Sequence, residues 1–121
     1  MERLSFGSAA GRSIARFGSV EFTIAPLARL AGEGQVVCAR LGPGGRIGRH
    51  PSVGAQLLAV VEGSGWVAGG DGRREPIEAG MAVLWQPGEE HETGTDEGLV
   101  AVIVEVEAAT LVRDAPRPLP G

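Results

Sequence analysis

Residues 44–63 read Gly44-Gly45-Arg46-Ile47-Gly48-Arg49-His50-Pro51-Ser52-Val53-Gly54-Ala55-Gln56-Leu57-Leu58-Ala59-Val60-Val61-Glu62-Gly63. A glycine-rich turn precedes His50, and an apolar run follows it and ends at Glu62 and Gly63. Side chains of an extended strand alternate between its two faces, so His50, Ser52 and Gln56 share one face if this stretch is extended. The stretch therefore predicts strands that carry a small polar site.

The spacing of this stretch resembles the first motif of the cupin family. That motif is a glycine, five residues, a His, one residue, a second His, three or four residues, a Glu, six residues and a glycine. This chain has Gly44, His50, Ser52, Gln56 and Gly63 at those places. Ser52 thus stands where the family has its second His, and Gln56 stands where it has Glu.

A second stretch resembles the other cupin motif, which is a glycine, five residues, Pro, one residue, Gly, two residues, His, three residues and Asn. Gly80, Gly88 and His91 fit this pattern, whereas Gln86 and Thr95 depart from it. The two motifs occur in order, are separated by a predicted hairpin and together cover roughly residues 44–95. The resemblance implies a cupin-type double-stranded β-helix, also called a jelly-roll barrel.

Composition independently favours an all-β single domain. A chain of 121 residues is long enough for one core, and its 20 Gly and 8 Pro separate short apolar runs. Short strands divided by such turns are typical of antiparallel sandwiches and barrels. We expect an N-terminal arm over residues 1–18, the barrel over 19–112 and an extended Pro-rich tail over 113–121.

Local patterns predict where the strands and turns lie. Turn signals occur at residues 31–34, and Gly63-Ser64-Gly65 is expected to break a strand. Cys38 lies in an apolar run and is expected to be a small buried residue. Strands are expected at residues 20–24, 35–41, 55–61, 66–68, 73–77, 81–85 and 99–106.

Charge and missing residue types exclude several functions. The net charge is −4 and no basic block occurs, which argues against a nucleic-acid partner. No apolar run approaches the length of a membrane span, and a single cysteine fits a reducing, cytoplasmic location. The chain has no Lys and no Tyr, so a lysine Schiff base and a tyrosine general acid are both impossible. Cupin-like sugar epimerases, which use a His–Tyr pair, are thereby disfavoured.

The resemblance implies a metal site formed by His50, Gln56 and His91, with Ser52 and Glu89 as further candidate ligands. Two imidazoles and a carboxylate suit non-haem iron and related ions. Gln56 is neutral, however, and removes the negative charge that would offset a cation. Two alternatives therefore stay open, namely a divalent ion (Fe, Mn, Ni or Zn) and a pocket without metal.

Two further residues are candidates for the pocket. Trp85 precedes the second motif and either packs in the core or forms a stacking wall for a ligand. Arg49, with Arg46, flanks the expected entrance and either binds a carboxylate or phosphate of a ligand or remains a solvated loop charge.

Two functional hypotheses follow, and the sequence does not decide between an enzyme and a binding protein. The first is a small cupin enzyme that acts as a metal-dependent dioxygenase or isomerase on a small organic molecule. The second is a non-catalytic barrel that binds or senses a small molecule without metal.

The apolar pattern also predicts self-association. In residues 57–61 and 99–104 both strand faces are apolar, whereas a strand with one wet face should alternate apolar and polar residues. A two-fold partner would cover the second face. We therefore expect a homodimer, with N-terminal strands exchanged or packed across the interface.

Overall fold

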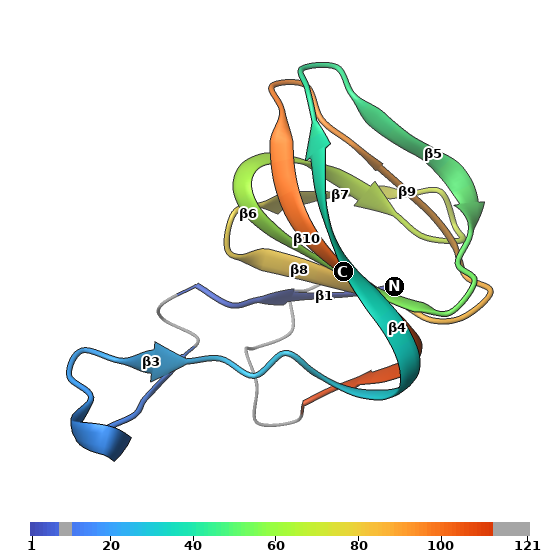
Figure 1. Cartoon of the computed structure of the whole chain (residues 1–121). Helices are drawn as coiled ribbons and strands as arrows, with labels where there is room; N and C mark the ends of the chain where they lie inside the picture. The colour runs from blue at the N-terminus through green and yellow to red at the C-terminus, as the bar shows by residue number, and fades with distance from the viewer. Residues whose placement is uncertain (8–10, 113–121) are drawn as a thin grey trace.

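The computed structural model describes residues 1–7 and 11–112, and within them it is built almost entirely of strands (Figure 1). One short 3₁₀ turn, η2 (Arg16–Gly18), is present, and no helix of the described residues is long and apolar enough to cross a bilayer. The expected all-β class is confirmed, while the expected tail at 113–121 lies outside the described residues. The strands are β1 (Glu2–Ser5), β2 (Arg12–Ser13), β3 (Thr23–Ile24), β4 (Ala28–Leu41), β5 (Arg46–Pro51), β6 (Ala55–Ala68), β7 (Arg74–Glu78), β8 (Met81–Trp85), β9 (Glu90–Gly94) and β10 (Leu99–Leu111).

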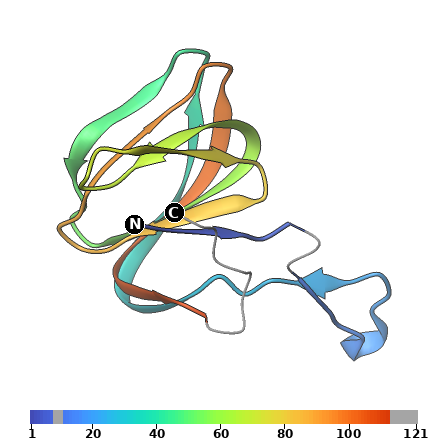
Figure 2. The ribbon, with the colours of Figure 1, turned by 180° about the vertical axis from the view of Figure 1, so that it is seen from behind.

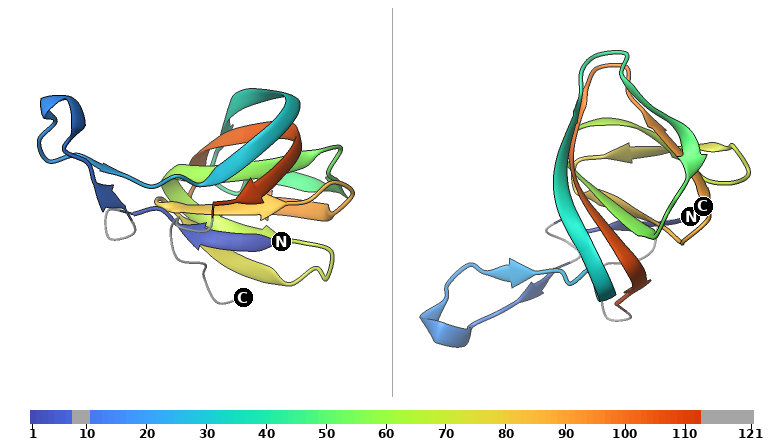
Figure 3. Two further views of the ribbon diagram at one scale, coloured as in Figure 1. Left: turned by 90° about the horizontal axis from the view of Figure 1, so that it is seen from below. Right: turned by 45° about the vertical axis from the view of Figure 1, so that its right-hand side comes forward.

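Strand β6 belongs to both layers of the fold. Its first part pairs with β8 and β10 in a layer of order β1-β8-β6-β10-β4. Its last part, from Ser64, pairs with β7 and β9, and β9 in turn pairs with β5. The two layers face each other across the interior, as the views in Figure 3 show.

The strand break expected at residues 63–65 is wrong, because β6 runs through it without interruption. Gly63 has φ +81°, and the register with β10 shifts between Val100 and Ala101. A Cβ at Gly65 would lie 2.1 Å from the carbonyl oxygen of Gly94. These glycines therefore let the strand bend and the backbones approach closely, rather than ending it.

The turn expected at residues 31–34 is also wrong. Strand β4 continues through these residues and pairs with β10 along its length. The register shifts between Val106 and Ala108, and Gly32, opposite this shift, has φ +91°. The glycine signal marks a β-bulge inside a long strand, not a chain reversal.

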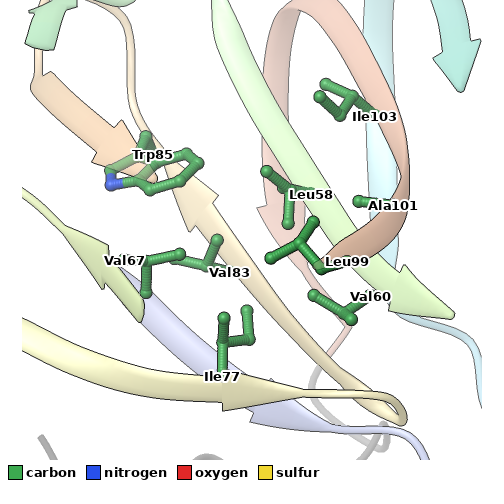
Figure 4. Packing of buried hydrophobic residues seen from close by; sticks show 9 residues of the cluster. All are labelled: Leu58, Val60, Val67, Ile77, Val83, Trp85, Leu99, Ala101 and Ile103. Carbon is green, nitrogen blue, oxygen red and sulfur yellow. The ribbon is translucent and has the colours of Figure 1, made fainter. Parts of the chain in front are cut away.

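The main core lies between the two layers (Figure 4). Trp85 and Val83 of β8 point toward Val67 of β6 and Ile77 of β7 in that view. Each of these four side chains is at most 1% exposed. The cluster is completed by Leu58, Val60, Leu99, Ala101 and Ile103.

A second apolar cluster covers part of the outer face of the larger layer. Its buried members include Leu57, Leu84 and Val106, and Leu4 and Phe6 from the N-terminal segment pack with them. Residues of opposite parity on β6 and β10 thus enter two different cores. This arrangement explains why both faces of these strands are apolar in sequence.

A hairpin formed by β2 and β3, with η2 at its tip, projects from the body (Figures 1 and 2). Phe17 and Val20 at the tip are 97% and 82% exposed. The expected arm, residues 1–18, therefore contains both a strand of the main sheet, β1, and the first part of this hairpin.

The expected burial of Cys38 is wrong, since its side chain is exposed. Strand β4 lies at the edge of the larger layer, and Cys38 alternates with the inward-facing Val37 and Ala39. It lies in one cross-strand row with Val102 and Ala59. We call the outward-facing set Val36, Cys38, Ala59, Val61 and Val102 the outer patch.

We expect the outer patch to be the contact face of a homodimer. Val36 and Val61 are 67% and 51% exposed, and a two-fold partner would bury such an apolar face twice. Sedimentation at micromolar concentration should show a dimer, and Val36→Glu should shift it to a monomer. Val53→Glu, at a fully exposed position outside this set of residues, should leave the dimer intact. A monomeric parent protein would contradict this expectation.

The close contact between Gly65 of β6 and Gly94 leads to a prediction about stability. Gly65→Ala forces a Cβ into the Gly94 backbone, so the free energy of unfolding should fall by about 3 kcal/mol. Gly70→Ala is the matched control, because a Cβ there meets nothing within 4 Å. Urea unfolding of the two variants measures the difference, and equal stability would show that the backbones at residue 65 can separate cheaply.

Candidate functional site

The two histidines of the chain lie side by side. His50 on β5 and His91 on β9 are directly opposed in the β-ladder, and their ring centroids are 4.2 Å apart with an interplanar angle of 56°. Tight turns precede both strands, with Gly45 N–H donating to Gly42 O and Glu89 N–H donating to Gln86 O. The two turns thus help to position both imidazoles side by side.

Backbone carbonyls determine the tautomers of both rings. His50 Nδ1 lies 2.7 Å from Gly48 O, and His91 Nδ1 lies 3.4 Å from Glu89 O. A carbonyl oxygen only accepts, so each Nδ1 is a donor, and in a neutral ring of this tautomer Nε2 keeps its lone pair. Histidines that bind metals are commonly oriented by this type of bond.

Two buried nitrogens of the site, Trp85 Nε1 and His91 Nε2, have no hydrogen-bond partner among the described residues. Trp85 Nε1 can only donate, so the one that can accept a hydrogen bond is on His91. The His91 side chain is 1% exposed. Burial, and then the neighbouring His50, lower the pKa of His91. The ring is therefore a neutral imidazole at neutral pH, which is the form that accepts a hydrogen bond or binds a cation.

A cavity of about 110 Å³ lies against this pair. Its lining includes Ser52 and Gln56 as well as both histidines, so the structure brings together these four residues singled out in the sequence. The Ser52 hydroxyl donates to Gly54 O at 2.5 Å, which leaves its oxygen lone pairs for another partner. The complete lining is His50, Pro51, Ser52, Val53, Gly54, Ala55, Gln56, His91 and Glu105.

Glu89, the further candidate ligand, is engaged elsewhere. Its carboxylate accepts from the amino group of Met1 at 2.5 Å and from Gln86 N–H at 3.0 Å. It does not line the cavity. Its contribution to the site is its carbonyl oxygen, which orients His91.

Trp85 and Arg49 lie beside the cavity and do not line it. The Trp85 ring is fully buried and contacts the His91 ring, with centroids 4.8 Å apart. It therefore supports the imidazole from behind. The Arg49 guanidinium donates to Gly69 O and Gly70 O and lies 3.9 Å from a Glu90 oxygen.

Glu105 is the cavity residue that sequence reasoning missed. It lies on β10 directly opposite Gln56 and opposite Gln35 of β4, whose amide donates to its carboxylate at 2.8 Å. Its parity matches that of the inward-facing Leu99, Ala101 and Ile103. Within residues 99–106, the strand expected from sequence, Glu105 is the one polar residue on that parity, which was the available signal.

The donor set fits a divalent ion only in part. Two imidazoles fit a transition metal, and the Gln56 amide can supply a weak oxygen donor. Across residues 1–7 and 11–112, however, no three His, Cys, Asp or Glu side chains converge to hold a metal ion. The site therefore offers two strong ligands and lacks a converging carboxylate.

Comparison with known proteins identifies the family. The family model described as a cupin domain matches residues 37–107, and the chain therefore belongs to the cupin family. The fold is a double-stranded β-helix. A search of curated proteins found no match.

Solved structures support the same fold. A cupin-like protein from Thermotoga maritima superposes with a TM-score of 0.58 at 22% identity, over 70% of this chain and 74% of that one. A Klebsiella pneumoniae protein with a double-stranded β-helix domain superposes with a TM-score of 0.56 at 22% identity, over 74% of this chain and 84% of that one. A predicted oxalate decarboxylase from Thermotoga maritima superposes with a TM-score of 0.53 at 24% identity, over 64% of this chain and 65% of that one.

Burial of neutral His91 predicts a pH dependence of stability. Its pKa in the folded state lies below the value of 6.5 for a free side chain, so the unfolded chain binds a proton more readily. The free energy of unfolding should therefore fall as the pH drops below 6.5 toward the folded-state pKa. Urea midpoints measured across this range should show the decline, and His91→Gln should reduce its slope. An unchanged slope in the variant would contradict the assignment.

Proposed function

We propose that this cupin binds a small organic molecule in the histidine cavity, next to a divalent transition-metal ion held by His50 and His91. The observation that carries the proposal is the buried, unpartnered Nε2 of His91 beside the His50 ring. An unsatisfied buried acceptor costs free energy, which a bound cation or donor would recover. Gln56 would be the third, weaker ligand.

The tautomers and the low pKa of His91 support metal binding. Both Nδ1 atoms donate to carbonyls, so Nε2 is the nitrogen of each ring that would bind the ion. Imidazole ligands suit Zn, Ni and Fe, whereas Mn prefers oxygen donors. With a neutral amide as the third ligand, we expect a weaker site than one with a carboxylate.

Such an ion would supply Lewis-acid chemistry to an oxygen of the substrate. The chain's own residues would hold the ligating imidazole in place and bind the substrate. The Trp85 ring would keep the His91 imidazole in place, and Ser52 and Gln56 would offer hydrogen-bonding groups to the substrate. This set is compatible with dioxygenase or isomerase chemistry.

A metal-free binding barrel is the second candidate function. It is favoured by the substitution of Ser52 and Gln56 at the ligand positions of the family motif and by the lack of a converging third acidic ligand in the described part of the chain. In that case the two Nε2 atoms would accept hydrogen bonds from the ligand itself.

Metal analysis tests the proposal. Protein purified without an affinity tag should contain a divalent ion or bind added Zn²⁺, and His50→Ala and His91→Gln should each weaken Zn²⁺ binding by at least about tenfold, the effect of losing roughly 1.4 kcal/mol. Glu92→Ala is the control, because this carboxylate faces Arg46. Calorimetric titration gives the affinities, and circular dichroism confirms that the variants are folded.

Two results would favour the second candidate instead. One is a parent protein that takes up no Zn²⁺, and the other is a pair of histidine variants that bind Zn²⁺ as tightly as the parent does.

A further inference from the structure

An outer groove adjoins the histidine cavity. Its volume is about 560 Å³, and it shares Val53, Gly54 and Glu105 with the cavity. The cavity alone is smaller than the range of roughly 300–1,000 Å³ that is usual for ligand pockets, whereas the groove lies within it. The full lining of the groove is Glu33, Gly34, Gln35, Val53, Gly54, Glu105, Val106 and Glu107.

The lining of both spaces is acidic. Glu33, Glu105 and Glu107 line the groove, no Arg lines either space, and none of these carboxylates has an ion-pair partner among the described residues. The arginines nearest in sequence to the site are engaged elsewhere. Arg49 is bonded to the 69–70 turn and Arg46 faces Glu92.

Glu105 is the charged residue common to both spaces. Gln35 donates to its Oε2 atom, and its Oε1 atom has no bond within the part of the chain that the structure describes. The side chain is half-buried, so its charge is less screened than that of a fully exposed carboxylate. The acidic residues are not the sole indication of a ligand, because His91, which is 1% exposed and whose Nε2 has no hydrogen-bond partner among the described residues, lines the same cavity.

We propose that the site selects a small molecule with a protonated amine, whose cationic group pairs with Glu105. A hydroxyl or similar polar group of the same molecule lies at the histidine pair. This inference rests on the proposed function, since it takes the histidine cavity as the ligand site. It disfavours a carboxylate or phosphate at the Glu105 position, because an anion there would meet the Glu105 carboxylate and no Arg lines either space.

Glu105 acts on the ligand in this proposal and not on a metal. It is the cross-strand neighbour of Gln56, yet it does not converge with His50 and His91 into a three-ligand group among the described residues. Its carboxylate is held instead by Gln35 of the edge strand β4. The amine would thus be bound at the side of the cavity that opens into the groove.

Three small probes of similar size and different charge test the selection. Ethanolamine is cationic, ethylene glycol is neutral and glycolate is anionic, and each carries a hydroxyl. Titration of isotope-labelled protein, followed by amide NMR shifts of Gly54, Glu105 and Val106, should rank ethanolamine first and glycolate last. Glu105→Gln should weaken ethanolamine binding by about tenfold, as expected for loss of a charge-assisted bond. Ethylene glycol binding should be unchanged in that variant.

Glu78→Gln is the matched control, because Glu78 is an exposed carboxylate on β7 that lines neither space. The proposal is overturned if millimolar ethanolamine causes no shifts, if glycolate binds as tightly, or if Glu105→Gln leaves ethanolamine binding unchanged. It is also overturned if Glu105→Gln weakens Zn²⁺ binding as much as His91→Gln does, since Glu105 would then be a metal ligand. Glu105-dependent ethanolamine binding without Zn²⁺ uptake would support the inference and remove the metal from the proposed function. Zn²⁺ uptake without a preference for ethanolamine would overturn the inference and keep the metal in the proposed function.

Discussion

Close backbone approach at Gly65 is the constraint on which the rest of this fold depends. A Cβ at this position would lie 2.1 Å from Gly94 O, so the lack of a side chain lets the end of β6 pair closely with β9 of the second layer. The start of β6 carries Gln56 to the cavity, and its end holds β9, which carries His91. One strand therefore connects both halves of the site.

The site combines a rigid acceptor with an acidic surrounding. His91 is held between the Trp85 ring and a carbonyl, and its Nε2 has no partner in the described structure. Glu105 contributes the negative charge that Gln56, at the acidic position of the family motif, lacks. The charge lies on the neighbouring strand, where it faces the ligand space and does not converge with the imidazoles. This displacement separates the proposed tasks of holding an ion and recognising a ligand.

The outer face of the larger layer is also divided, into a region that the chain itself covers and a region that it leaves exposed. Leu57 and Val106 are covered by residues of the same chain, including Leu4. Val36 and Val61, farther along the same face, are not covered. The self-covered region stabilises the barrel, and the uncovered region is the surface that we expect a second copy to bury.

Much of the site followed from sequence alone. Motif spacing indicated that His50, Ser52, Gln56 and His91 belong to one site, and all four line the cavity. The argument from strand parity does not apply, because His50 lies near the end of β5, Gln56 lies near the start of β6 and Ser52 lies between the two strands. The all-β class followed from short apolar runs between glycines and prolines, which are local signals.

Other features depended on which strands become neighbours. Glu105 joins the cavity because β10 pairs with β6 in a particular register, and Cys38 is exposed because β4 is an edge strand. The glycines at 31–34 and 63–65 form a bulge and a bend instead of turns, since long-range pairing continues through them. Parity along one strand reveals the face of a side chain, but cross-strand partners come from pairings between residues far apart in the chain.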